Sequence, residues 1–222
     1  MAHIENDILN YKTPYTVDGN DESVLKNKIG INDVEQLNTA ERMITSFKLS
    51  KLYLNTGAQS FDVNHLKSIH KFLFEDIYPF AGEFRRENIA KRIHFCLVDY
   101  IESNLDMTLK KAIKMVPKLV DRDTLLRYIT ELYSDLDMIH PFREGNGRTE
   151  REFVRQYIDY VCKVNNLPSY YLDYNLIEDR EAYIDAIVKA DALCSYGDLM
   201  ALFDRILRVR EDEKKLEEGP KL

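Results

Sequence analysis

The stretch His140-Pro-Phe-Arg-Glu-Gly-Asn-Gly-Arg-Thr-Glu-Arg151 places an imidazole, two carboxylates, two glycines, an asparagine and three arginines within twelve residues. Helical patterns flank it on both sides. Before it, Leu125, Ile129, Leu132, Leu136 and Ile139 recur at the spacing of one helix face, and an apolar stripe from Phe153 to Cys162 follows it. We therefore expect a loop between two helices, held in place by a helical bundle.

The segment Gly145-Asn146-Gly147 lies where the second of these helices begins. Glycine permits positive φ and a close approach of the backbone to a ligand. The unpaired N–H groups and the positive dipole end of a helix N-terminus bind anions, phosphate above all. Arg148 and Arg151 are three residues apart and share a face of the helix. Two guanidinium groups beside such a turn suit an anion with several charges, such as a di- or triphosphate.

Two further residues of the stretch favour chemistry on that anion. Glu144 would repel phosphates unless a cation lay between them, and Mg²⁺ held by one carboxylate and phosphate oxygens resolves the conflict. An unperturbed histidine has a pKa of about 6.5, so a histidine at position 140 is a candidate base at neutral pH. Taken singly, each residue has a structural interpretation: a plain turn, a core histidine, a solvated arginine face or a loop carboxylate. Phe142 is expected to pack and to do no chemistry.

The rest of the chain is expected to supply the helical bundle, so the predicted fold class is all-α. Apolar periodicity and cap residues predict helices over 32–54, 62–78, 99–116, 121–139, 148–164, 179–191 and 196–210. Apolar residues of the segment 80–95 have mixed spacing, which fits a short β-hairpin better than a helix. Residues 1–22 are expected to form an extended arm, 23–210 the domain and 211–222 a charged tail.

Composition narrows the class of protein. With 222 residues and 45% hydrophobic residues the chain is globular, and its net charge of −7 argues against nucleic acid as a partner. Its three cysteines form no CxxC pair, so we expect reduced thiols and no zinc site. The start has no secretory pattern and no apolar run reaches membrane length, so we expect no membrane association and a cytoplasmic location. Export as an effector by a machine that reads no such signal remains open.

Other nucleotide and hydrolase signatures are missing from the sequence. It contains no GxxxxGK[ST] loop, no GxGxxG after a strand and no GxSxG elbow. The remaining histidines, His70 among them, have no paired ligand spacing and are expected to be structural or exposed.

At every fixed position the stretch from His140 to Arg151 resembles the Fic signature, HxFx[D/E]GNGRxxR. Asn27 to Ile31 with the helix after them, and Tyr78 to Glu83, are similar to further segments of that family. Asn88-Ile89-Ala90-Lys91 resembles the segment that leads into its target-binding flap. The resemblance implies a Fic-type helical bundle with a short β-hairpin flap.

The resemblance also implies an activity: a protein adenylyltransferase (AMPylase) moves AMP from ATP to a Ser, Thr or Tyr hydroxyl of a target protein and releases pyrophosphate. His140 would deprotonate the hydroxyl, and Glu144 would bind Mg²⁺ between the α- and β-phosphates. The implied ATP-binding residues are Arg143, Gly145, Asn146 at the α-phosphate, Gly147, and Arg148 and Arg151 at the β- and γ-phosphates. The flap that aligns the target by strand-like pairing would include Asn88, Ile89, Ala90, Lys91 and Phe95.

Regulation and rival functions follow from the same resemblance. Many relatives carry an inhibitory helix with [S/T]xxxE[G/N], whose glutamate pairs with the second arginine of the signature, here Arg151. No Glu-Gly or Glu-Asn pair of this chain has Ser or Thr four residues before the glutamate. We therefore expect a separate small antitoxin to supply that glutamate, with Glu218 as the intramolecular alternative. A deAMPylase, another nucleotidyltransferase, and a nucleotide-binding interaction module without turnover are the rival functions.

Overall fold

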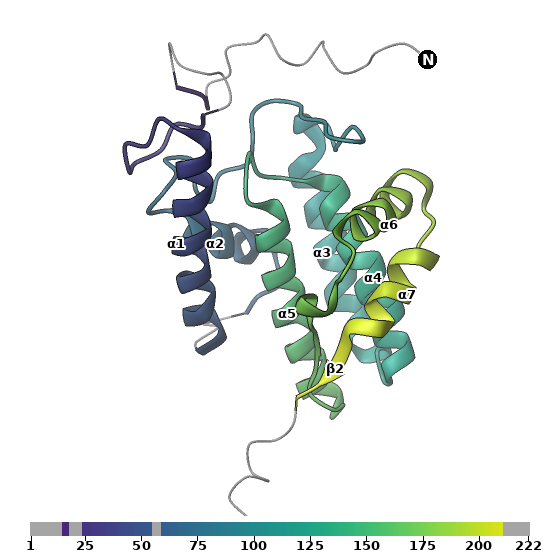
Figure 1. Cartoon of the computed structure of the whole chain (residues 1–222). Coiled ribbons are helices and arrows are strands. Elements are labelled where there is room, and N and C mark those ends of the chain that lie inside the picture. The colour runs from purple at the N-terminus through teal and green to yellow at the C-terminus, as the bar shows by residue number, and fades with distance from the viewer. Residues whose placement is uncertain (1–14, 18–23, 55–58, 211–222) are drawn as a thin grey trace, which may run out of the picture.

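The structure is a computed structural model that describes residues 15–17, 24–54 and 59–210. Most of the predicted arm and the whole predicted tail, with Glu218, lie outside the described residues. The described part of the chain forms seven α-helices and one two-stranded sheet (Figure 1). In order these are α1 (Val34–Leu54), α2 (Val63–Phe74), α3 (Ile101–Met115), α4 (Arg122–Ile139), α5 (Asn146–Asn165), β1 (Tyr170–Leu172), α6 (Arg180–Leu193), α7 (Gly197–Ile206) and β2 (Leu207–Val209).

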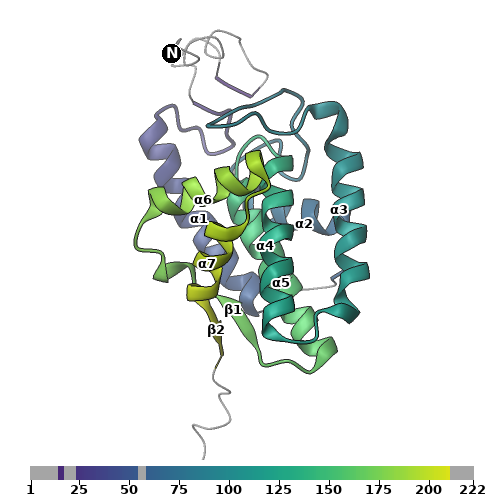
Figure 2. The ribbon, with the colours of Figure 1, turned by 90° about the vertical axis from the view of Figure 1, so that its right-hand side faces the viewer.

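Helix α5 is the centre of the bundle. It packs against α4 and α2, while α4 also contacts α3, α6 and α7. Figure 1 shows α5 between α1 on one side and the α6–α7 pair on the other, and in the view of Figure 2 that pair lies in front of α1. Its core face carries fully buried apolar side chains such as Phe153, Tyr157 and Val161, each at 0% exposure. The loop from His140 to Gly145 thus joins two helices whose positions the whole core determines.

Most predicted helices are confirmed, and the differences have local causes. The N-cap of α1 is Asp33, whose Oδ1 accepts the Gln36 N–H at 2.8 Å, rather than Asn32. Helix α2 ends at Phe74 instead of Tyr78. Pro79 disfavours helical geometry at Tyr78, and the Ile77 carbonyl accepts the N–H of Lys28 at 2.7 Å instead of a helical partner.

The sheet was not predicted. Strand β1 pairs antiparallel with β2, with Tyr170 opposite Val209 and Leu172 opposite Leu207. The predicted last helix continued to residue 210, and this extension is wrong because 207–209 form backbone hydrogen bonds with β1. The pairing joins segments on either side of α6 and α7, so no local pattern predicts it.

The predicted hairpin segment contains no helix and no regular strand. A single antiparallel bridge joins Ala90 to His94, and the Phe95 N–H donates to the Ile89 carbonyl at 3.3 Å. The segment is therefore a narrow hairpin-like turn with one bridge. Arg92 at its tip forms ion pairs with Glu181 and Asp185 of α6, which connect the turn to the bundle.

None of the described helices combines the length and the apolar character that crossing a membrane requires. The three cysteines, Cys96, Cys162 and Cys194, form no disulfide with one another.

Candidate active site

Two residues in left-handed backbone conformations bound the loop between α4 and α5. His140 ends α4 with φ 46°, and Gly145 precedes the first turn of α5 with φ 82°. A Cβ on Gly145 would lie 2.2 Å from Cζ of Phe74, so the loop packs directly on the α2 ring. Both the backbone conformation and the close contact require glycine at this position. The first turn of α5, as at any helix start, leaves backbone N–H groups without helical partners.

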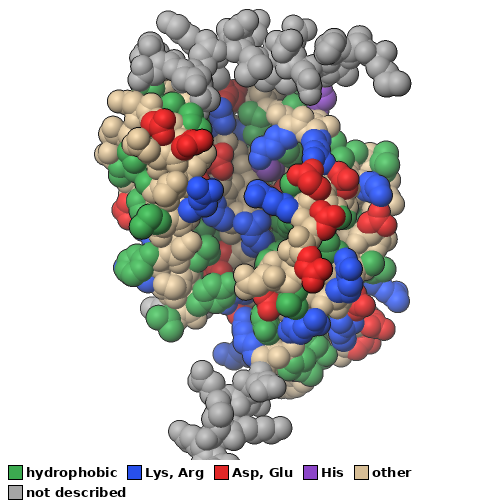
Figure 3. Space-filling view, in the orientation of Figure 1, with side chains coloured by type: hydrophobic (Ala, Val, Ile, Leu, Met, Phe, Trp, Pro, Cys, Tyr) green, Lys and Arg blue, Asp and Glu red, His purple; other side chains and the backbone are tan. Residues whose placement is uncertain are grey.

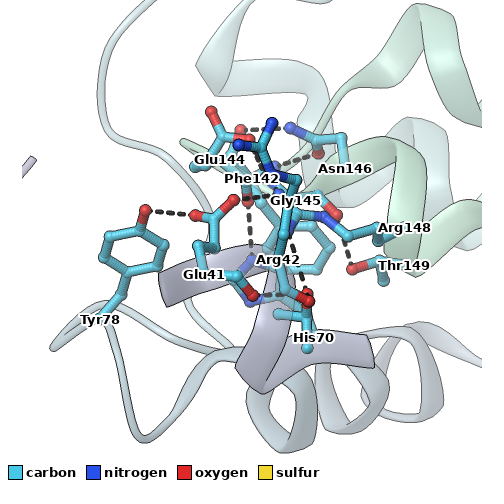
Figure 4. A network of polar contacts seen from close by, with 11 residues as sticks. Glu41, Arg42, His70, Tyr78, Phe142, Glu144, Gly145, Asn146, Arg148 and Thr149 are labelled. Atoms are coloured by element: carbon cyan, nitrogen blue, oxygen red, sulfur yellow. Dashed lines mark hydrogen bonds and ion pairs between the residues drawn. The ribbon is translucent and has the colours of Figure 1, made fainter. Parts of the chain in front are cut away.

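Asn146 closes the loop from inside. Its Oδ1 accepts the Phe142 N–H at 2.8 Å, and its Nδ2 donates to the Phe142 carbonyl at 2.8 Å (Figure 4). The residue is 3% exposed. Both ends of the amide form hydrogen bonds within the loop, so Asn146 helps to shape it. One N–H of Nδ2 remains, and the contact with the α-phosphate that the resemblance implies stays a prediction.

A stacked histidine supports the loop from below. The His70 ring lies 3.8 Å from the Phe142 ring, nearly parallel to it, and Phe142 is buried as expected of a packing residue. His70 Nδ1 accepts the Gly82 N–H at 2.8 Å, so Nε2 carries the proton and donates to the Glu144 carbonyl at 2.9 Å. Burial lowers the pKa of His70 to about 4, which keeps this tautomer neutral. The expectation of a structural histidine is confirmed.

Glu144 has a partly exposed carboxylate next to the start of α5. Its Oε1 accepts the N–H of Gly145 at 2.8 Å and lies 3.5 Å from Nη2 of Arg148, and 38% of the side chain is exposed. A half-exposed carboxylate beside an anion-binding turn has the oxygen donor that Mg²⁺ prefers, with room for further oxygens from substrate and water. The donor chemistry at this position therefore fits the predicted cation.

Arg148 is held by α1. Its guanidinium pairs with Glu41, donates to Thr45 Oγ1 at 3.2 Å and lies 4.9 Å above the Phe74 ring. The other carboxylate oxygen of Glu41 accepts the Tyr78 hydroxyl (Figure 4). Sequence reasoning missed Glu41. The signal was present, because Glu41 and Thr45 are polar residues at helical spacing on the buried face of α1.

Arg151 lies deeper, with its guanidinium centre 5.6 Å from the Tyr174 ring centroid and the side chains of Tyr133 and Tyr183 beside it. No carboxylate of the described residues forms an ion pair with it. A Cβ on Gly147 would lie 3.1 Å from Nη1 of Arg151, so the glycine leaves space for this guanidinium beside the first turn of α5.

Arg148 and Arg151 line the same cavity, of 440 Å³, together with Arg155 and Arg210. Figure 3 shows basic side chains around the hollow in the middle of this face, between α1 and the C-terminal elements. Arg155 is neutralised by Glu152 at 2.6 Å, and Arg210 pairs with Asp159 at 2.7 Å. Arg151 is therefore the arginine of this cavity whose charge no carboxylate in the described part of the chain balances.

His140 faces the loop from the end of α4. Its ring stacks on Phe95, and its Nδ1 lies 3.2 Å from the backbone oxygen of Asp137. A carbonyl oxygen only accepts, so neutral His140 carries its proton on Nδ1 and leaves the Nε2 lone pair free to take a proton. Asp137 and Phe95, neither of which the sequence linked to His140, thus define its tautomer and its plane.

Arg85 ties the flap to the loop and was also missed. The side chain is 3% exposed, and its Nε donates to the His140 carbonyl at 2.8 Å and its Nη1 to the Glu87 carbonyl at 2.8 Å. Further bonds reach the Ile139 and Cys96 carbonyls. All of these hydrogen bonds go to backbone carbonyl oxygens. No residue type in the sequence marks such partners, so the role of Arg85 could not be predicted from the sequence.

Some predicted residues lie apart from the cavity. Arg143 pairs with Glu87 at 2.7 Å and does not line it. In the flap, Asn88 Oδ1 accepts the Val98 N–H at 3.0 Å. Ile89, Ala90 and Lys91 belong to the one-bridge turn, and Phe95 lies against His140 rather than at a free edge.

Comparisons with known proteins point to one family. A model described as the Fic/DOC family matches residues 60–158. The chain is 32% identical over 199 residues to the protein adenylyltransferase VbhT of Bartonella schoenbuchensis, which covers 86% of this chain but only 38% of VbhT. It is 28% identical over 196 residues to the probable protein adenylyltransferase y4lH of Sinorhizobium fredii, covering 84% of this chain and 91% of the relative.

Solved structures share the fold. The BepC protein of Bartonella tribocorum with bound AMPPNP superposes with a TM-score of 0.75 at 20% identity, covering 89% of this chain and 97% of that one. A Fic domain of Bartonella quintana with bound ADP gives a TM-score of 0.75 at 22% identity, covering 92% and 98%.

Proposed function

This chain belongs to the Fic/DOC family, and on that premise we propose that it is a protein adenylyltransferase that moves AMP from ATP to a hydroxyl of a target protein. Relatives at 28–32% identity are named as protein adenylyltransferases or probable ones. The observation that carries the proposal is the loop from His140 to Gly145. It holds a base with a free Nε2 at one end and an anion-binding helix start at the other.

The nucleotide is assigned to the loop and the cavity beside it. The α-phosphate lies at the N–H groups of α5's first turn, and the β- and γ-phosphates lie at Arg148 and Arg151. Two observations support this: both guanidinium groups line one cavity of 440 Å³, and no carboxylate of the described residues balances Arg151. Two proteins of this fold have been crystallised with AMPPNP and ADP. Arg143 is expected to contribute less to ATP binding than Arg148 and Arg151, because its guanidinium already forms an ion pair with Glu87.

Glu144 is the residue of the loop that would hold Mg²⁺. The ion, when bound, neutralises phosphate oxygens as charge develops on the departing pyrophosphate. The carboxylate is oriented by the Gly145 N–H, so its position relative to the helix start does not depend on the substrate.

The chemical step needs one proton acceptor and an oriented phosphorus. The target's hydroxyl oxygen forms a bond to the α-phosphorus while its proton passes to Nε2 of His140. The bond from the α-phosphorus to the bridging oxygen breaks, and its electron pair leaves with pyrophosphate. The remaining contribution of the protein is positioning and charge neutralisation, which account for most catalysis of phosphoryl-type transfer.

The flap is proposed to align the target. Residues Asn88 to Lys91 take part in only one bridge, between Ala90 and His94, so their backbone keeps groups that an extended target segment could pair with. Phe95 connects this segment to His140 and thereby sets the distance between target and base.

Restraint by a separate small antitoxin is the regulatory part of the proposal. Its support is the missing inhibitory motif together with Arg151, which is open to a carboxylate from outside. Deleting residues 212–222 should leave automodification unchanged, whereas a large rise would show that Glu218 of the tail is the inhibitor instead. The proposed catalytic domain spans 23–210 and acts in the cytoplasm of its own bacterium. Attachment of label in host-cell extract alone would point to an exported effector.

The decisive experiment is incubation of the full chain with α-³²P-labelled ATP, Mg²⁺ and bacterial lysate. We expect label on protein in the wild type and none with His140→Ala. Label from γ-³²P-ATP would instead indicate phosphoryl transfer. Tight ATP binding without label in any lysate supports an interaction module, and release of AMP from a pre-labelled target supports the deAMPylase.

A further inference from the structure

Behind His140, three acidic side chains from three helices meet in the core. Asp137 comes from α4, Glu150 from α5 and Asp191 from α6. Ligand atoms of Asp137, His140 and Glu150 all lie within 4.8 Å of one another. Glu150 is 1% exposed, so this acid cluster lies under the proposed active site and outside the nucleotide cavity.

The cluster has too few hydrogen-bond donors for three ionised carboxylates. Among the described residues, no N–H or O–H group donates a hydrogen bond to either carboxylate oxygen of Glu150. The same holds for Oδ2 of Asp191. Ser134 donates to the other oxygen of Asp191 at 2.6 Å. An unpaired buried carboxylate is strongly destabilising, so such a group takes up a proton.

The charged and titratable groups around Glu150 are Asp137, His140, Arg151 and Asp191, with the phenols of Tyr133 and Tyr174 near them. Burial raises the pKa of Glu150 well above its usual range, and the charge of Asp137 raises it further. Burial also raises the pKa of Asp191 to about 8. Burial by itself would raise the pKa of Asp137. Hydrogen bonds, of which the one from His140 has the largest effect, outweigh burial, so the pKa of Asp137 is lowered.

We propose that Glu150 is a protonated carboxylic acid that donates a hydrogen bond to Asp137, and that Asp137, fixed in this way, is a positioning residue for His140. Two carboxyl groups this close share a hydrogen bond only when one of them carries a proton. Asp137 then keeps both of its oxygens facing inward, one towards Glu150 and one 3.6 Å from Nδ1 of His140.

The position of the His140 proton distinguishes this arrangement from a metal site. Nδ1 lies 3.2 Å from the Asp137 carbonyl oxygen, which requires an N–H at that nitrogen. A cation bound by the same three residues would need the Nδ1 lone pair and would leave the proton on Nε2, where it blocks a base. The role of Asp137 in catalysis rests on the proposed function, but the placement of the two protons does not.

The first test needs no activity. In ¹⁵N and ¹³C NMR spectra of the full chain at pH 7, we expect His140 as the Nδ1–H tautomer and Glu150 as a protonated carboxyl. Glu150→Gln, which is isosteric and still donates a hydrogen bond, should keep the tautomer. Asp137→Ala retains the backbone carbonyl and should keep it too, but its Nδ1–H resonance should shift because the carboxylate 3.6 Å away is lost. An ionised Glu150, or an Nδ1–H resonance that is unchanged in Asp137→Ala, contradicts the proposal. Stoichiometric Zn²⁺ binding that Glu150→Gln abolishes would do so as well.

The second test measures AMP transfer. Asp137→Ala should lower kcat by about 10- to 100-fold, less than most of the roughly 10²–10⁴-fold that a positioned base contributes, and leave the KM for ATP unchanged. Glu150→Gln should stay within about twofold of the wild type, while Glu150→Leu, which cannot donate, should resemble Asp137→Ala. Asp135→Asn, two residues before Asp137 on α4, is the matched control and should retain wild-type kcat. A raised KM with unchanged kcat in Asp137→Ala overturns the positioning role.

The two hypotheses fail differently. Correct protons by NMR in a chain that transfers no AMP would reject the proposed function alone. AMP transfer by a chain with an ionised Glu150 would reject the positioning proposal alone.

Discussion

The imidazole of His140 lies flat against the phenyl ring of Phe95, with ring centroids 3.9 Å apart and ring planes 12° from parallel. His140 ends α4, and Phe95 ends the hairpin-like segment, so the proposed base and the proposed target flap share one contact. Asp137 faces the ring nitrogen and Phe95 faces the ring plane, and together they leave His140 6% exposed. The base is therefore oriented before substrate arrives.

Phe95→Ala should lower kcat for AMP transfer by about tenfold, because the His140 ring loses the surface that fixes its plane. The KM for ATP should not change, since Phe95 does not line the nucleotide cavity. Steady-state kinetics over a range of ATP concentrations measures both quantities. Phe47→Ala, at a position 61% exposed on α1, is the control, and equal kinetics in the two variants would contradict the role of the stack.

Arg85→Met should destabilise the fold by about 3 kcal/mol, because several buried carbonyl groups, among them those of His140 and Glu87, lose a charged donor. Its neighbour Arg86 is the matched control. Arg86 is exposed and pairs with Glu83 at 3.2 Å on the surface, so Arg86→Met should cost no more than about 0.5 kcal/mol. Urea unfolding gives both values. Similar losses for the two variants would show that the Arg85 contacts are not what connects flap and loop.

Gly145→Ala should destabilise the protein by about 2–4 kcal/mol, because the new Cβ adds backbone strain at φ 82° and overlaps the Phe74 ring. Gly30→Ala separates these two causes. Gly30 has φ 71° with nothing within 4 Å of a Cβ, so this variant should lose only about 1 kcal/mol from strain. Thermal and urea unfolding distinguish them. Equal losses would mean that the contact with Phe74 contributes nothing.

His70 should make the fold sensitive to acid. Its pKa is about 4 in the folded protein because the ring is buried, against about 6.5 in the unfolded chain. Between these values the unfolded state binds more protons, so the free energy of unfolding falls as the pH drops from 6.5 to 4. The loss from this residue is about 3 kcal/mol. Urea titrations across that range should show a smaller slope in His70→Gln, and an identical slope would refute the assignment.

Glu41→Gln should raise the KM for ATP severalfold and change kcat less, because Arg148 loses the carboxylate that holds its guanidinium at the cavity. A loss of stability of about 1–2 kcal/mol accompanies it, since Glu41 also accepts the buried Tyr78 hydroxyl. Glu35→Gln, exposed on the first turn of the same helix, is the control for charge alone. A lower KM would show instead that Glu41 competes with the phosphates for Arg148.

The helices and the chemistry of the loop could be predicted from the sequence because both depend on residues close together in the chain. Apolar residues at a spacing of three or four define helix faces whatever they pack against. In the same way, Glu144, Gly145 and Arg148 meet because a turn and the first turn of a helix bring them together. The hydrogen bonds of the Asn146 amide to the Phe142 backbone are a local detail that the signature does not specify.

The tertiary structure alone decided which partners orient these groups. Glu41 reaches Arg148 from α1, Asp191 approaches Asp137 from α6, and β1 finds β2 across two helices. The physical reason is that a periodic pattern records which face of an element is buried and not which element covers it. The sequence can therefore predict that a carboxylate on such a face is buried. It cannot predict which side chain from another element becomes its partner, because that depends on how the core packs.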